Sequence, residues 1–209
     1  MANQIMLITP SLFESRTISS ALSYNGYAVV TETTEMNRAM QKMNSIKFDA
    51  LVIELQGRKE LEFARNARGI NCQMGIIFIS PIHDLRLFDL TFEELPPGSQ
   101  IIYKPNIANF EIIIESIIES RKSDAATRWI NLPDIDKTEK LTDLQVETLR
   151  MVVSGFTNKE ISKQEFVSEK AVEQRIGRLA NVLGITFSNG QNLRVKLTAQ
   201  FVNWTNGRK

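Results

Sequence analysis

The sequence predicts an α/β doubly wound five-stranded parallel sheet, followed by a small all-α domain that contains a helix-turn-helix. Three observations support this fold class. Short apolar runs alternate with helical patterns through the first part of the chain, as in a parallel sheet covered by helices. Strong helix-start signals then recur between residues 141 and 185. The length of 209 residues accommodates two modest domains, each with its own core.

The first domain alternates strictly between strands and helices. The predicted strands cover residues 4–9, 27–31, 50–55, 75–80 and 100–103. The predicted helices cover residues 12–24, 35–45, 58–68, 85–94 and 108–121. This order matches the flavodoxin-like sheet, with right-handed crossovers between its strands. The last helix is more apolar than one contact with the sheet requires, so its extra surface is either core or a dimer face.

The domain boundaries follow from composition. We expect residues 1–121 to form the sheet domain and residues 141–209 the helical domain. The polar stretch 122–140 contains Pro133 and is predicted to be a linker, part of which Trp129 and Ile130 can pin to one domain.

Helix-capping residues organise the second domain. Thr142 is placed to cap a first helix, and Gly155 to end it in a left-handed conformation. Thr157 and Glu160 form a capping-box pattern at the start of a second, short helix. Ser168 then caps a third helix. Its predicted buried stripe has helical spacing and consists of Val172, Ile176, Leu179 and Leu183.

This stretch resembles the LuxR-type helix-turn-helix that ends NarL/FixJ-type response regulators. The matching residues run without a gap over about forty-five positions and include Leu141-Thr142, Glu147, Leu149, Gly155, TNKEI at 157–161, VSEKAV at 167–172 and LGI at 183–185. The resemblance implies that the outer face of the third helix reads base edges in a DNA major groove.

The resemblance also assigns residues to the DNA interface. The base-reading positions fall on Glu173, Gln174 and Gly177, and the candidates for phosphate contact are Lys159, Ser168, Lys170, Arg175 and Arg178. Glu173 and Gly177 depart from the family pattern, as does Glu165, where the family has a core leucine. Charged helix faces are usually only solvated surfaces, but the complete motif favours double-stranded DNA as the partner.

Charge distribution agrees with a DNA-binding tail. The chain holds 25 basic and 24 acidic residues, for a net charge of +1. Residues 138–209 contain 11 basic and 7 acidic residues, so this part is net +4 and the remainder net −3. The final apolar helical stretch, 193–204, corresponds to the helix that often forms the dimer contact in the family, so we expect a homodimer.

The sheet ahead of this tail resembles a receiver domain, whose reaction requires an acceptor aspartate, a Mg²⁺-binding acidic pair, a hydroxyl and a lysine. At the matching positions, Thr9, Pro10 and Ser11 occupy the place of the acidic pair, and Glu54 that of the acceptor. Ser80 and Lys104 supply the hydroxyl and the lysine, and Ile101 occupies the aromatic switch position. The acidic pair and the aspartate are missing, so aspartyl phosphorylation is expected to fail.

Glu54 allows two interpretations. Its longer side chain can mimic the phosphorylated state, or it can form an ion pair with Lys104 in an inactive site. The ion pair is favoured, because one carboxylate rarely reproduces three phosphoryl oxygens. Under either interpretation, DNA binding does not wait for a kinase.

Several function classes are excluded or disfavoured. A single histidine, His83, rules out a histidine-based metal cluster or catalytic triad, and no glycine-rich phosphate loop occurs. We therefore expect no enzyme activity, no metal and no cofactor. The single cysteine excludes an intramolecular disulfide. No signal peptide or membrane-spanning stretch is found, which predicts a cytoplasmic protein without a membrane partner.

The sequence thus predicts a dimeric transcription regulator with an atypical receiver, controlled by its expression level or by an unknown ligand or partner protein at that receiver. Two alternatives stay open. One is a conventional phospho-switched response regulator with an unconventional site. The other is a protein-interaction module that has lost DNA binding, motivated by Glu165, Glu173 and Gly177.

Overall fold

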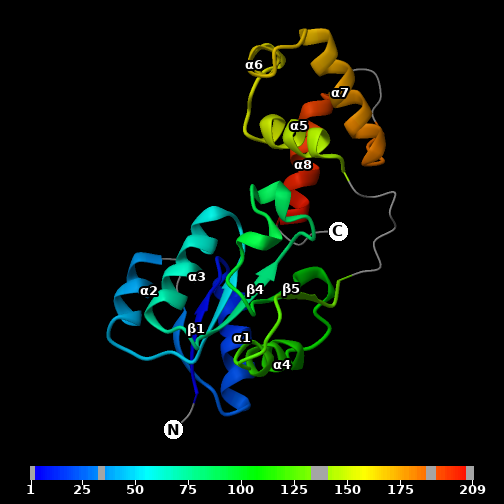
Figure 1. Cartoon of the computed structure of the whole chain (residues 1–209). Helices are drawn as coiled ribbons and strands as arrows, with labels where there is room; N and C mark the ends of the chain where they lie inside the picture. Colours follow the sequence, from blue (N-terminus) through cyan, green and yellow to red (C-terminus); the bar gives the residue numbers. More distant parts are fainter. Residues whose placement is uncertain (1–2, 33–35, 133–140, 187–191, 206–209) are drawn as a thin grey trace. The chain divides into compact units, whose positions relative to one another are not determined.

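The structure is a computed structural model, and it describes residues 3–32, 36–132, 141–186 and 192–205. The chain divides into two compact units (Figure 1). The first is built from residues 1–83 and 88–133, and the second from residues 84–87 and 134–209. Among the described residues, no helix is both long enough and apolar enough to cross a membrane.

The first unit contains a parallel sheet in the order β2-β1-β3-β4-β5-β6. Its strands are β1 (Gln4–Ile8), β2 (Ala28–Glu32), β3 (Ala50–Glu54), β4 (Gly75–Ser80), β5 (Gln100–Tyr103) and β6 (Arg128–Ile130). The first five lie where the sequence predicts them and have the flavodoxin-like order. Because all strands are parallel, the loops that follow them meet at one edge of the sheet.

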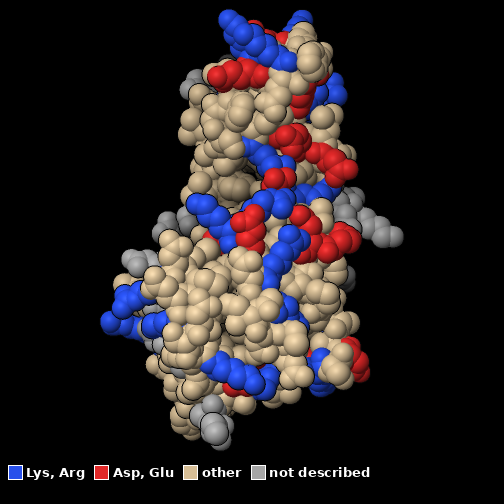
Figure 2. All heavy atoms as spheres, turned by 60° about the vertical axis from the view of Figure 1, so that its left-hand side comes forward, with Lys and Arg blue, Asp and Glu red and all other residues tan. Residues whose placement is uncertain are grey.

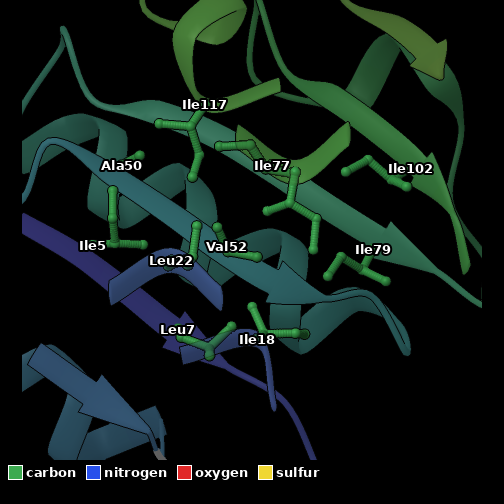
Figure 3. Close-up of a cluster of buried hydrophobic side chains, with 11 residues drawn as sticks. Ile5, Leu7, Ile18, Leu22, Ala50, Val52, Ile77, Ile79, Ile102 and Ile117 are labelled. Carbon is green, nitrogen blue, oxygen red and sulfur yellow. The ribbon is translucent and has the colours of Figure 1, made fainter. Parts of the chain in front are cut away.

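Helices cover both faces of this sheet. Helices α1 (Leu12–Tyr24) and α4 (Glu111–Ser120) lie on one face, and α2 (Met36–Met43) and α3 (Arg58–Ile70) on the other (Figure 1). Figure 3 shows the core under α1 and α4, where alternate strand residues point toward the same helices. This cluster consists of Ile5, Leu7, Ile18, Leu22, Ala50, Val52, Ile77, Ile79, Ile102, Ile113 and Ile117.

The sheet has one strand more than the five that the sequence predicts. Residues 128–130, within the predicted linker, form β6 and pair with the edge of β5. The Gln100 amide donates to the Ala126 carbonyl at 3.0 Å and its oxygen accepts from Arg128 at 2.9 Å, which holds the short strand in place. Pairing also satisfies backbone groups that an open edge would leave exposed. Residues 133–140, the rest of the predicted linker, lie outside the described residues.

The helix predicted over residues 85–94 is also wrong. Two short 3₁₀ helices, η1 (Leu85–Phe88) and η2 (Phe92–Glu94), replace it. Between them Asp89 has a φ of 60°, a left-handed conformation that interrupts a helix. Thr91 then starts η2 through a capping box. Local hydrogen bonding at these residues therefore overrides the apolar pattern of the segment.

The second unit is a helical bundle that includes α5 (Asp143–Val153), α6 (Asn158–Gln164), α7 (Glu169–Val182) and α8 (Leu193–Thr205). The predicted caps are confirmed: Thr142, Thr157 and Ser168 each accept a backbone hydrogen bond at a helix start. Gly155 has a φ of 88°, as expected after α5. The fully buried core residues come from all four helices: Leu149, Ile161, Val172, Leu179, Ala180 and Leu197.

Candidate functional site

The turn between α6 and α7 sets the position of the exposed helix face. The Val167 amide donates to the Ser162 carbonyl at 3.0 Å, and the Ala171 amide donates to the Ser168 hydroxyl at 3.2 Å. Phe166, which lies between Ser162 and Val167 in the sequence, has a φ of 57° and is 95% exposed. A tight turn of this kind, followed by a capped helix, is the geometry of a helix-turn-helix.

An ion pair closes this turn. The Arg175 guanidinium of α7 donates to the carboxylate of Glu165, the residue that ends α6. Both side chains are largely buried, at 17% and 16% exposure. The glutamate therefore occupies its interior position together with a compensating charge. Arg175, predicted as a phosphate contact, is placed by the structure in this internal pair.

The remaining predicted residues of α7 lie on its outer face. Lys170, Glu173, Gln174 and Arg178 are exposed, and Lys159 is exposed on α6. Gly177 is half-buried, yet outside the backbone of its own helix and the adjacent residues a Cβ added there would meet no atom within 4 Å. In Figure 2, charges of both signs are intermingled on the face that is drawn. The exposed side chains of α7 carry charges of both signs, because Glu169 and Glu173 lie on the same helix as Lys170 and Arg178.

Arg194 is a positioning residue that sequence reasoning missed. It lies in the first turn of α8 and donates to the Asn158 side-chain oxygen at 2.8 Å and to the Phe156 carbonyl. These bonds hold α8 against the loop that begins α6. The available signal in the sequence was the charge of this arginine within a largely apolar helical stretch.

A second group of polar residues gathers at the loop edge of the sheet in the first unit. The Lys104 ammonium lies 2.9 Å from Glu54 Oε1 and 3.0 Å from Glu54 Oε2. The Thr9 hydroxyl donates to Glu54 Oε2 at 3.3 Å. The Glu54 side chain is only 4% exposed. The ion pair that the sequence favours for Glu54 therefore forms.

Glu14 joins this group, although sequence reasoning did not include it. Its Oε2 atom lies 2.8 Å from Lys104 Nζ and 3.4 Å from the Thr9 hydroxyl. The sequence pattern places residues 9–11 at the acidic pair, whereas Glu14 reaches the same group from the first turn of α1. Ser11, which caps α1 by accepting from the Glu14 amide at 3.3 Å, was the available signal.

Burial and charge act in opposite directions on these groups. Burial raises the pKa of Glu54, while hydrogen bonds from Lys104 and Thr9 oppose that rise. For Lys104, burial favours the neutral amine, but its hydrogen bonds with Glu14 and Glu54 outweigh burial and raise its pKa. The two carboxylates therefore keep Lys104 charged.

The other predicted positions do not join the charged group. The Ser80 hydroxyl is buried and donates to the Ile82 carbonyl at 2.6 Å. Ile101 is fully buried within β5, on the sheet face opposite its neighbour Ile102. Pro10 is exposed in the loop before α1. Of the predicted receiver residues, Thr9, Glu54 and Lys104 are thus brought together.

Comparison with known proteins agrees with both parts of the fold. Residues 139–187 match the family described as bacterial regulatory proteins, luxR family. None of the curated proteins searched matches the chain. A response regulator receiver protein from Sinorhizobium medicae WSM419 is 23% identical, with a TM-score of 0.50, over 58% of this chain and 96% of that one.

Two further structures align along almost the whole chain. The two-component response regulator RcsB in a DNA complex is 14% identical, with a TM-score of 0.52, over 98% of this chain and 99% of that one. RcsB from Salmonella enterica serovar Typhimurium, bound to promoter rprA in the presence of phosphomimetic BeF3−, is 12% identical, with a TM-score of 0.50, over 99% of both chains. At these identities the likeness concerns the fold.

Proposed function

We propose that this chain, which carries a LuxR-type helix-turn-helix behind a domain with the receiver fold, is a DNA-binding transcription regulator that acts without aspartyl phosphorylation. The observation that carries the proposal is the helix-turn-helix itself. Its sequence matches the luxR family, and its third helix, α7, presents exposed Lys170, Gln174 and Arg178 on one face. The similar RcsB structures were determined with DNA.

The α7 face suits DNA by the chemistry of its side chains. Gln174 can both donate and accept hydrogen bonds at a base edge, and Glu173 can accept from a cytosine amino group. Arg178 and Lys170 can contact phosphate, as can Lys159 from α6 and the backbone amides at the Ser168 cap. Arg175 is withdrawn from this set by its pair with Glu165. We therefore expect base readout to depend mainly on Gln174 and its exposed neighbours.

The donor set in the first unit supports independence from phosphorylation. Receiver chemistry requires Mg²⁺ held by carboxylate oxygens beside the acceptor. Residues 9–11 supply no carboxylate. The two carboxylates that are present, Glu14 and Glu54, are both bound to the Lys104 ammonium. Mg²⁺ would have to compete with the Lys104 ammonium for these carboxylates, so these residues do not fit Mg²⁺.

A homodimer and a cytoplasmic location complete the proposal. Val195 and Val202, seven residues apart on α8, are 63% and 44% exposed and lie on one helix face. An apolar strip of this kind suits contact with a second copy. Two copies would read a two-fold symmetric site. A regulator of transcription acts in the compartment that holds the DNA.

The test is a selection of bound fragments from random DNA, with untreated full-length protein and no phosphodonor. We expect a two-fold symmetric motif. Arg178→Ala or Gln174→Ala should weaken binding to that motif about tenfold, the effect of losing one good contact. Arg16→Ala removes an exposed basic residue of α1 in the other unit and is the matched control, with unchanged affinity expected.

Other outcomes separate the alternatives. If the full chain selects nothing but residues 138–209 bind DNA, the first unit inhibits binding and a releasing signal is required. If that fragment, shown to be helical by circular dichroism, also fails, the protein is an interaction module and the DNA-binding proposal is wrong.

A further inference from the structure

A pocket of about 200 Å³ opens above the charged group in the first unit. Its walls are apolar and come from two helices and the segment between β5 and α4. Phe13 and Ile18 belong to α1, Ile107 and Phe110 precede α4, and Ile113 lies in its first turn. Glu14, Glu54 and Lys104 are the charged residues of its lining and are called here its polar end. All of these residues belong to one unit.

Both carboxylates of the polar end already bind the Lys104 ammonium. Its nitrogen lies 2.8 Å from Glu14 Oε2, and 2.9 Å and 3.0 Å from the two oxygens of Glu54, which share one N–H direction. An anionic ligand at Lys104 would lie beside two carboxylates and be repelled by them. Small acids are therefore poor candidates for this pocket.

The same groups leave one negative charge uncompensated. Two carboxylates face a single ammonium, and the Thr9 hydroxyl, which lies within hydrogen-bond distance of both, adds no charge. The Glu14 side chain lines the pocket and is 33% exposed. Two aromatic rings, Phe13 and Phe110, line the walls, and aromatic faces attract cations.

We propose that this pocket binds a small apolar amine, with the ligand ammonium at Glu14 and the apolar body between α1 and the start of α4. Pockets for drug-sized ligands have volumes of about 300–1,000 Å³, so this smaller one suits a ligand of about ten non-hydrogen atoms. The ligand ammonium would compensate the excess negative charge. The inference goes beyond the proposed function, since it assigns a ligand class to the first unit.

The experiment is calorimetric titration of the full chain with three probes of nearly equal shape: 2-phenylethylamine, 2-phenylethanol and 3-phenylpropanoate. We expect the amine to bind about tenfold more tightly than the alcohol, because its ammonium makes charge-assisted hydrogen bonds. The carboxylate should not bind at millimolar concentration. Glu14→Gln removes the excess charge and should bring the amine close to the alcohol in affinity.

A second pair of variants tests the location. Thr17→Trp places a large ring in the pocket that Thr17 lines and should abolish amine binding. Arg16→Trp puts the same ring on an exposed position of α1 and should leave binding intact. Both variants must retain the circular dichroism spectrum and the DNA affinity of the parent, so loss of the pocket is distinguished from loss of the DNA-binding function.

Three results would overturn the inference. These are an amine that does not bind at millimolar concentration, equal affinities for amine and carboxylate, and amine binding that survives Thr17→Trp. Each can occur while the DNA selection succeeds, because the titration does not involve DNA.

Discussion

Lys104 and Glu54 form a buried ion pair, with the ammonium 2.9 Å from one carboxylate oxygen and 3.0 Å from the other. The lysine follows β5 and the glutamate ends β3, so the pair joins two strands at the loop edge of the sheet. Glu14 makes the lysine a bridge between two carboxylates. Loss of the lysine would therefore leave two carboxylates without their shared counter-charge.

Lys104→Met should destabilise the protein in a pH-dependent way. Removing one partner of a buried pair costs about 3 kcal/mol. Burial already raises the Glu54 pKa, and loss of Lys104 raises it further. A carboxyl with a raised pKa in the folded state favours folding only when protonated. The deficit in the free energy of unfolding, measured by urea denaturation, should be large at pH 8 and should shrink toward pH 5.

The double variant Lys104→Met/Glu54→Gln is the control. Its side chain at position 54 cannot ionise, so most of the pH dependence of the deficit should disappear. A Lys104→Met deficit that is the same at both pH values would show that loss of Lys104 does not raise the Glu54 pKa into this range, and would contradict the prediction.

Phosphodonor treatment should leave the protein unmodified. Acetyl phosphate with Mg²⁺ is expected to add no mass by intact-protein mass spectrometry, because Lys104 already binds both nearby carboxylates. DNA affinity should be the same before and after treatment. A phosphorylation-competent receiver treated in parallel verifies the donor. A gain of one phosphoryl group that Glu54→Gln abolishes would support a conventional phospho-switch instead.

The sequence predicts regular elements well because their signals are local. The apolar runs place β1 to β5, and each capping residue places a helix start in the second unit. Prediction fails over residues 85–94 because Asp89 adopts a left-handed conformation that the apolar pattern does not reveal. It also misses β6, where three residues become a strand through pairing with β5 and contacts to Gln100.

The candidate sites show the same division between local and distant signals. Glu54 and Lys104 can be paired from their strand positions. Glu14 cannot, because it reaches the group from α1 and lies 90 positions from Lys104 in the sequence. The partner of Arg175 could not be predicted either. Its position on α7 indicates an outer-face residue, but in the structure it forms an ion pair with Glu165 at the turn. Partners across a turn decide what such a side chain contacts.

Glu165→Ala should destabilise the second unit by about 2 kcal/mol, because it leaves the largely buried Arg175 without its counter-charge. Urea denaturation followed by circular dichroism measures the loss. Glu165→Leu/Arg175→Met replaces the pair with apolar groups and should recover most of the stability. Additive losses in a double-mutant cycle would show that the two residues do not interact.

Gly177→Ala separates helix stability from DNA contact. Outside the backbone of its own helix and the adjacent residues, a Cβ at this position meets no atom within 4 Å. Alanine also favours a helix over glycine by about 1 kcal/mol, so the free energy of unfolding should rise. If α7 approaches DNA closely at Gly177, the added methyl group should weaken binding to the selected DNA. Ser20→Ala, at an exposed position of α1 in the other unit, is the control: it also improves helix propensity but should leave affinity unchanged. A Gly177→Ala variant that is more stable and binds DNA equally well would show that α7 does not approach DNA closely at this glycine.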